Sequence, residues 1–253
     1  MRKTNPARTT WAAGILLMIM LLVNGTLPFA SETDSPAAIS LFNGKDLTGW
    51  KAMHEPSEWL AASQVVMSPK NNKIFDIQPG EGILVNGPKG NTSNIYTEYE
   101  HGDCQLHIEF MVPKDSNSGV YFQGLYEIQI LDSFGKEKLE FGDCGGIYAR
   151  YKDEKTYEGH PPRVNASKAP GEWQSFDVTF RAPRFDANGQ KTENAKFILV
   201  KHNGQIVHEN VEVTGGTRAC MERDEAPRGP LMLQGDHGPV AYRNIQLTPL
   251  ELK

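Results

Sequence analysis

Short apolar stretches, separated by glycine, proline and polar turn residues, recur along the chain from about residue 40 onward. Many alternate between apolar and polar positions, as Leu106, Ile108 and Phe110 do, and a period of two is typical of strands with one buried face. No segment keeps apolar residues at helical spacing over about three turns, and the 24 glycines and 16 prolines interrupt most windows. The pattern predicts about a dozen short strands, at residues 64–67, 74–77, 82–85, 94–97, 104–112, 120–122, 126–131, 176–181, 195–202, 205–213, 230–234 and 240–247.

Two hairpins can be predicted within this pattern. Asn203 and Gly204 separate two alternating runs, and an Asn-Gly pair in that place favours a two-residue hairpin turn. A second hairpin is predicted from the strands at 120–122 and 126–131, joined by a turn centred on Gly124. Many short strands with this punctuation indicate an all-β fold, an antiparallel two-sheet sandwich or jelly roll.

The second strand of the latter hairpin carries the candidate site. Glu127 and Gln129 fall on one face, because successive side chains point to opposite sides of a sheet, and two positions along a strand span roughly 6.5–7 Å. Asp132 has the wrong parity for that face, but a β-bulge near residues 130–131 would bring it round to join the other two. The alternative interpretation is that Glu127 and Gln129 line an ordinary solvated face of a sheet.

Residues 1–30 have the pattern of a signal peptide. Three basic residues precede an apolar run at 11–23, which is short for a membrane span of about 20 residues but suits the core of a signal peptide. We expect a flexible leader at 31–40 and a single domain at 41–253. The mature protein would then be exported, to the periplasm or the extracellular space, without a stable membrane span. An uncleaved N-terminal anchor is the alternative.

Charge and cysteine content narrow the function further. Removing the signal peptide removes three positive charges, so the formal net charge changes from −5 to about −8. The mildly acidic domain has no basic stripe, which excludes nucleic-acid binding. Cys104, Cys144 and Cys220 leave open either one disulfide with a free thiol or three thiols, and their spacing matches no zinc or redox motif.

Residues 133–173 form a long stretch with only one short strand pattern, at 146–149. Connections of this length in a compact domain are usually functional or disordered. The apolar anchors of the stretch and its Cys144-Gly145-Gly146 turn favour an ordered loop laid over one face of the sandwich.

Several sequence motifs follow one another in the order of a known family: LFNGKDLTGW (41–50), NSGVYF (117–122), YEIQILDS (126–133), CGGIY (144–148), PP (161–162), NASK (165–168), GEWQ (171–174), HENVE (208–212), GPLMLQGDHG (229–238) and YRNI (242–245). Over roughly residues 40–250 the chain resembles the 3-keto-disaccharide hydrolase family. One departure is Gly235, an extra glycine between Gln234 and Asp236 where the family pattern has Gln-Asp-His.

The resemblance implies a concanavalin-like jelly roll of two antiparallel sheets, with a sugar held on one concave face. The Glu127-x-Gln129-x-x-Asp132 spacing is also similar to the acid-x-acid-x-x-acid signature of laminarinase-type glycosidases on a similar sandwich. Gln129 stands at the middle acid, and a retaining glycosidase needs two carboxylates about 5–5.5 Å apart. Ordinary retaining hydrolysis is therefore not expected.

The resemblance further implies a substrate oxidised to a ketone at C3, which acidifies the hydrogen on C2. A base could remove that proton, the C1 substituent could leave, and water could add back. In these terms Glu127 or Asp132 would be the base and His237 the acid or second base. Lys168 and Gln129 are candidates for the contact with the keto oxygen. A divalent cation could replace that contact, with Glu127, Asp132 and His237 as its ligands.

The remaining candidate residues lie in the long stretch after the hairpin. We expect residues 133–171 to cover the site and to bring Tyr148, Arg150, Asn165 and Lys168 to its rim, where they would bind sugar hydroxyls or the ketone. The implied partners are a carbohydrate substrate and an upstream sugar 3-oxidoreductase that makes the ketone. The alternative function is a non-catalytic carbohydrate-binding module on the same fold.

Overall fold

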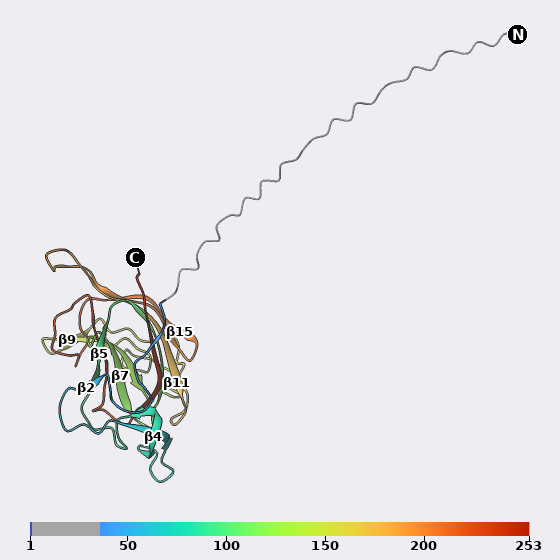
Figure 1. Ribbon diagram of the computed structural model, residues 1–253, viewed down its shortest axis with the longest axis vertical. Coiled ribbons are helices and arrows are strands. Elements are labelled where there is room, and N and C mark those ends of the chain that lie inside the picture. The colour runs from blue at the N-terminus through green and yellow to red at the C-terminus, as the bar shows by residue number, and fades with distance from the viewer. Residues whose placement is uncertain (2–35, 253) are drawn as a thin grey trace, which may run out of the picture. The chain divides into compact units, whose positions relative to one another are not determined.

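Two antiparallel sheets make up the domain. The computed structural model describes Met1 and residues 36–252, and the regular elements of these residues are all β-strands. Figure 1 labels β2, β5 and β7 of the smaller sheet and β4, β11 and β15 of the larger one. The prediction of an all-β antiparallel sandwich is confirmed.

The larger sheet has eight strands, in the order β15 (Gln205–Val213), β14 (Ala195–His202), β11 (Gln174–Arg181), β6 (Cys104–Met111), β17 (Ala241–Pro249), β4 (Phe75–Val85) and β3 (Leu60–Met67), with β1 (Ile39–Ser40) paired to β17. The smaller sheet has five strands, in the order β2 (Trp50–Ala52), β5 (Ile95–His101), β16 (Gly229–Leu233), β7 (Asn117–Phe122) and β8 (Tyr126–Leu131). Two separate hairpins pair β9 (Arg150–Lys152) with β10 (Lys155–Tyr157) and β12 (Arg184–Phe185) with β13 (Lys191–Glu193).

Aromatic side chains from both sheets meet in the core. The ring centroid of Phe122 on β7 lies 5.0 Å from that of Phe180 on β11 and 5.4 Å from that of Phe197 on β14. Tyr126 on β8 lies 5.6 Å from Phe180. All four rings are fully buried, and each pair of this kind contributes roughly 1 kcal/mol beyond the burial of its area. Because the apolar residues face this core, their polar neighbours, Glu127 among them, face the other way.

The Asn-Gly hairpin is confirmed. Strands β14 and β15 have the predicted bounds, and the turn between them has φ of 49° at Asn203 and 79° at Gly204. Two successive positive φ angles match the right-handed twist of the flanking strands, and Asn and Gly are the residues that adopt them at least cost.

One pair of predicted strands forms a single element. The stretches at 74–77 and 82–85 both belong to β4, because a register shift opposite Ala62 on β3 takes up the residues between them. The turn signal of Pro79 and Gly80 thus marks a bulge within a continuous strand.

The predicted signal peptide lies outside the described residues. Of the predicted leader, Ile39 and Ser40 form β1, where Ile39 pairs with Leu247. Cys104, Cys144 and Cys220 are free thiols. Within the described residues, the structure contains no apolar helix of membrane-spanning length.

Candidate active site

The β7–β8 hairpin carries the candidate site on its outer face. Tyr121 pairs with Glu127 and Gly119 pairs with Gln129, with no shift of register along the ladder. Glu127 and Gln129 therefore share one face, as predicted, and both line a cavity of about 380 Å³. The lining consists of Asn117, Tyr121, Glu127, Gln129, Tyr148, Arg218, Ala219, Gln234 and His237.

Glu127 is the one carboxylate among these nine lining residues, and only 2% of it is exposed. Burial is the main reason that the pKa of its carboxyl is raised to about 8. A hydrogen bond from the Tyr121 hydroxyl lowers this pKa, and the negative charge of Asp236 raises it further. The pKa of Tyr121 is raised as well, first by burial and then by the facing carboxylate. A carboxyl whose pKa lies close to neutral pH is suited to exchange protons with a substrate.

Gln129 occupies the place of a second acid. Its Nε2 donates a hydrogen bond of 3.1 Å to Asn117 Oδ1, which fixes both amides and leaves the Gln129 oxygen and the Asn117 nitrogen for a ligand. The cavity therefore lacks the carboxylate pair of a retaining glycosidase.

Residues 145–148 run along the free edge of β8. The Gln129 amide donates to the Gly146 carbonyl at 2.8 Å, and the Tyr148 amide donates to the Glu127 carbonyl at 3.1 Å. The short strand predicted at 146–149 is only a pair of isolated bridges from Ile147. The segment thus pairs with the edge of the sheet and places the Tyr148 side chain on the cavity wall.

The loop between β15 and β16 closes another side of the cavity. Thr217 donates its amide to the Leu125 carbonyl at 2.8 Å and accepts the Glu127 amide at Oγ1, 3.2 Å away. Its neighbour Arg218 is exposed, lines the cavity, and holds its guanidinium 4.6 Å from the ring centroid of Tyr151. Arg218 has no ion pair among the described residues, so its charge is available to a ligand.

His237 enters the cavity from the segment after β16. Its Nδ1 lies 2.6 Å from Asp236 Oδ1, which leaves Nε2 for a ligand. The extra Gly235 has a steric reason, because a Cβ there would come within 2.3 Å of the Ser93 carbonyl oxygen. The glycine lets the two backbones approach while His237 still reaches the cavity.

Asp132 does not join the site. The bulge predicted at residues 130–131 is absent, since the ladder continues in register to the pair of Asn117 with Leu131. Asp132 follows the end of β8, and its Oδ2 accepts the Asp115 amide at 3.0 Å. The predicted convergence of three side chains is therefore wrong for Asp132, which stabilises a turn.

Three other candidates also lie away from the cavity lining. Lys168 donates from Nζ to the Trp173 carbonyl at 3.0 Å and lines a separate hollow against the eight-stranded sheet. Asn165 donates to the carbonyls of Ser133 and Lys136, which holds its own loop together. The prediction that residues 133–171 bring four side chains to the rim thus holds only for Tyr148.

Arg150, the remaining candidate, contacts a different part of the chain. Its guanidinium hydrogen-bonds Thr214, and Nη1 lies 3.6 Å from a carboxylate oxygen of Glu158. These contacts fix the loop that carries Arg218.

The proposed cation ligands are not assembled. Glu127 and His237 line the cavity but Asp132 does not. Among the described residues, no three His, Cys, Asp or Glu side chains lie close enough together to hold a metal ion.

Several lining residues were not predicted. Tyr121 could have been found, because a turn centred on Gly124 places it directly across from Glu127. Arg218 and Ala219 carry no sequence signal, since only the tertiary fold brings their loop to β8.

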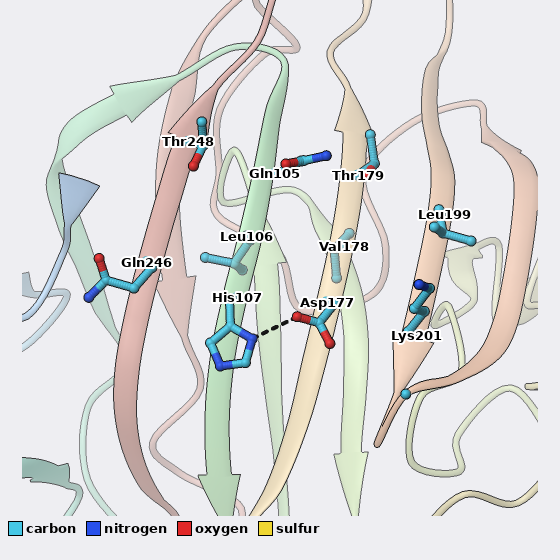
Figure 2. Close-up of a pocket in the computed structure, with 11 residues that line it drawn as sticks. Gln105, Leu106, His107, Asp177, Val178, Thr179, Leu199, Lys201, Gln246 and Thr248 are labelled. Carbon is cyan, nitrogen blue, oxygen red and sulfur yellow. Dashed lines mark hydrogen bonds and ion pairs between the residues drawn. The ribbon is translucent and has the colours of Figure 1, made fainter. Parts of the chain in front are cut away.

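A second hollow, of about 480 Å³, lies on the outer face of the eight-stranded sheet (Figure 2). There His107 Nδ1 lies 2.6 Å from Asp177 Oδ1, with Gln105 and Lys201 nearby. Its charged groups are all partly exposed and two of them pair with each other. Without a buried ionisable group it has the character of a solvated sheet face, and the cavity at Glu127 is the stronger candidate.

The fold and the site define a class: a β-sandwich with a sugar-sized polar cavity and a buried carboxyl on one sheet face. Residues 37–248 match the family described as 3-keto-alpha-glucoside-1,2-lyase-like domain. The chain belongs to this family, as the sequence motifs indicate.

Solved structures agree with that assignment. A candidate glycosyl hydrolase from Parabacteroides distasonis ATCC 8503 is 28% identical, with a TM-score of 0.60 and coverage of 84% of each chain. A second candidate glycosyl hydrolase from the same strain is 20% identical, with a TM-score of 0.53, over 85% of this chain and 94% of that chain. The search of curated proteins returned no significant match. The protein is thus a carbohydrate-active protein of the glycosyl hydrolase and lyase type.

Proposed function

We propose that this protein cleaves 3-keto-glycosides by elimination across C1 and C2, followed by addition of water. The observation that carries the proposal is the single buried carboxyl of Glu127, whose pKa is raised. The guanidinium of Arg218 and the imidazole of His237 line the same cavity. A site with one carboxylate does not suit double displacement at C1, but it suits removal of a proton next to a ketone.

Glu127 is the base. A carboxylate whose pKa is raised to about 8 binds a proton more strongly than an ordinary glutamate, and C2–H next to a ketone is a weak acid that needs such a base. The C2–H bond breaks, its proton goes to Glu127, and the electron pair enters the enolate that forms over C2, C3 and the keto oxygen.

Arg218 is the group that stabilises this enolate. Its guanidinium is held over the Tyr151 ring, and its backbone amide is fixed by a bond of 2.9 Å to the Ala149 carbonyl. A preorganised cation beside the developing negative charge lowers the barrier without reorganising in the transition state. Arg218 takes the role that the sequence predicts for Lys168.

His237 is the acid for the leaving group. The contact between Nδ1 and Asp236 holds the ring and leaves Nε2 free to reach a ligand. As the enolate collapses, C1=C2 forms, the C1–O bond breaks, and the leaving oxygen takes the proton from His237. Water then adds its hydroxyl to C1 and gives its other proton to His237, while the Glu127 carboxyl, after exchange with solvent, returns a proton to C2. Both groups regain their starting states, and the sum of the two steps is hydrolysis.

A ketone at C3 is not part of an ordinary sugar. The substrate must therefore be supplied by an oxidation of the C3 hydroxyl, which is the reaction of a sugar 3-oxidoreductase.

The proposal is tested by incubating the purified protein with a 3-keto-glucoside and with its unoxidised parent. We expect release of the aglycone from the keto compound alone. Equal turnover of both would contradict the elimination mechanism. Tight binding of both without turnover would contradict catalysis and favour a carbohydrate-binding module.

A further inference from the structure

We propose that Gln234 is a further substrate-binding residue of the cavity at Glu127, and that its side-chain amide holds the hydroxyl on C2 of the keto sugar. The inference rests on the proposed function, because it assigns a contact within that reaction. Gln234 directly follows β16 and lines the cavity, and only 6% of it is exposed. The contact fixes the carbon from which Glu127 removes the proton.

The side-chain amide of Gln234 is unpaired. The backbone groups of the residue are satisfied, since its amide donates to the Gly119 carbonyl at 3.0 Å and its carbonyl accepts from Ser118 Oγ at 2.8 Å. Its side chain makes no hydrogen bond to the residues that the structure describes, and its Oε1 is buried. A buried polar group without a partner is costly, and a hydroxyl of a bound sugar can supply the partner. Because a hydroxyl both donates and accepts, it can pair with either atom of the amide.

Gln234 lies beside the proposed base. Its backbone bond to Gly119 continues the pairing of β16 with β7, and Gly119 pairs with Gln129 on β8. Gly119 has no side chain, and the Glu127 carboxylate fills the space that a Cβ would take there. The carboxylate therefore lies over the middle strand, with one glutamine on each side.

The order of the oxygens around the sugar identifies the hydroxyl. In the proposed reaction His237 faces the oxygen on C1 and Arg218 faces the keto oxygen on C3. The hydroxyl on C2 lies between these two oxygens, and C2 also carries the hydrogen that points toward Glu127. Gln234 precedes His237 by three residues in the same segment. The adjacent carbons C1 and C2 thus meet adjacent parts of the chain.

A hydrogen bond to the C2 hydroxyl orients the C2–H bond. The hydroxyl and the hydrogen are attached to the same carbon, so holding the first restricts the movement of the second away from Glu127. Asn117 and Gln129 hold each other through a hydrogen bond of 3.1 Å, and their free atoms are left for the hydroxyls farther round the ring.

The test removes each partner of the contact in turn. The preference of the enzyme is the ratio of kcat/KM for methyl 3-keto-glucoside to kcat/KM for its 2-deoxy analogue. Gln234→Met keeps the length of the side chain without its amide, and it should lower this preference by about threefold to tenfold relative to the wild type. The intrinsic difference in reactivity between the two ketones cancels in that comparison.

Two controls accompany the measurement. Gln105→Met, at an exposed glutamine of β6 on the other sheet, should keep the preference of the wild type. The preference for methyl 3-keto-glucoside over its 6-deoxy analogue should be the same in the wild type and in Gln234→Met, because the C6 hydroxyl is not the partner of Gln234.

Equilibrium binding of unoxidised ligands is a second measurement, which needs no turnover. In an NMR titration of the wild type, the Kd for methyl 2-deoxy-glucoside should exceed that for methyl glucoside by about threefold to tenfold, and Gln234→Met should abolish the difference. Equal Kd values in the wild type would overturn the contact, and this result does not depend on the folding of a variant.

The two measurements separate this inference from the proposed function. Turnover with a preference that Gln234→Met leaves unchanged would overturn the contact and leave the proposed function standing. Absence of turnover, with a difference in Kd that Gln234→Met abolishes, would overturn the proposed function and leave the contact standing. A wild-type protein that neither binds nor cleaves these compounds would overturn both.

Discussion

The carboxylate of Glu127 lies against the backbone of Gly119 on the neighbouring strand. A Cβ at position 119 would come within 2.1 Å of Glu127 Oε1 and within 3.0 Å of Tyr121 Cε2. Gly119 pairs with Gln129 in a regular ladder, so its role is to leave space for the carboxylate. The glycine of the NSGVYF motif is thus explained by the position of the proposed base.

The first prediction follows from this contact. Gly119→Ala must displace the Glu127 carboxylate, and a displacement of about 1 Å at a reacting group can cost roughly 10²-fold in rate. We expect kcat/KM on a 3-keto-glycoside to fall by about that factor and the free energy of unfolding to fall by about 1–3 kcal/mol. Gly102→Ala, on the turn after β5, is the control. Full activity of Gly119→Ala would show that the carboxylate position is not critical.

The second prediction concerns stability and pH. The folded pKa of Glu127, about 8, lies above its ordinary value of 4.5. Between pH 4.5 and pH 8 the carboxyl keeps its proton in the native state and loses it in the unfolded state. The stability contributed by the protonated form is therefore present in full below pH 4.5 and is lost as the pH rises through 8. Glu127→Gln cannot ionise. It should therefore become more stable than the wild type with rising pH, by up to about 1.4 kcal/mol per pH unit and about 5 kcal/mol in all.

Chemical denaturation at pH 5 and pH 9 measures that difference. Glu98→Gln, an exposed residue of β5, is the control and should show no such trend. A constant difference between wild type and Glu127→Gln across this range would mean that the carboxyl is already ionised when buried.

The third prediction is the direction in which kcat/KM changes with pH. If Glu127 is the base and removal of the C2 proton limits the rate, kcat/KM should have a limb that rises with pH up to about 8, because only the ionised carboxyl can accept the C2 proton. The hydrogen bond from Tyr121 lowers the pKa of Glu127, so Tyr121→Phe should move this limb to higher pH. A profile without a rising limb, or a rising limb that Tyr121→Phe leaves in place, would contradict Glu127 as the base.

The fourth prediction compares two cations. Arg218 lines the cavity, whereas Lys168 contacts Trp173 near the other sheet. Arg218→Met should lower kcat by roughly 10²–10³-fold, the usual cost of losing one donor to a developing oxyanion. The kcat of Lys168→Met should stay close to that of the wild type. The opposite ranking would restore the role that sequence motifs assign to Lys168.

The strand pattern predicted the part of the site that is local in sequence. Residues 126–131 are β8 with the predicted bounds, and their alternation places Glu127 and Gln129 on one face. The same hairpin register also determines Tyr121 as the partner of Glu127. These relationships depend only on the period of two and on the position of the turn.

The remainder of the site depends on contacts between distant segments. Arg218 reaches the cavity because its loop bonds to Leu125 and Ala149, and nothing in the local sequence encodes that docking. Lys168 belongs to a well-matched motif, but a motif does not say which sheet its loop packs against. Asp132 was predicted to be a site residue from the spacing of the motif. Because β8 ends without a bulge, Asp132 does not share the face of Glu127 and Gln129.

The central claim is that Glu127 removes a proton from C2. The most direct test is cleavage of a 3-keto-disaccharide in deuterated water, with NMR or mass spectrometry of the released 3-keto-sugar and a parallel control for exchange of the free ketone. Elimination and hydration predict one deuterium at C2 for each bond cleaved, and turnover in Glu127→Gln should be slowed by about 10²–10⁴-fold. Cleavage that leaves C2 unlabelled would contradict the account, because displacement at C1 does not break the C2–H bond.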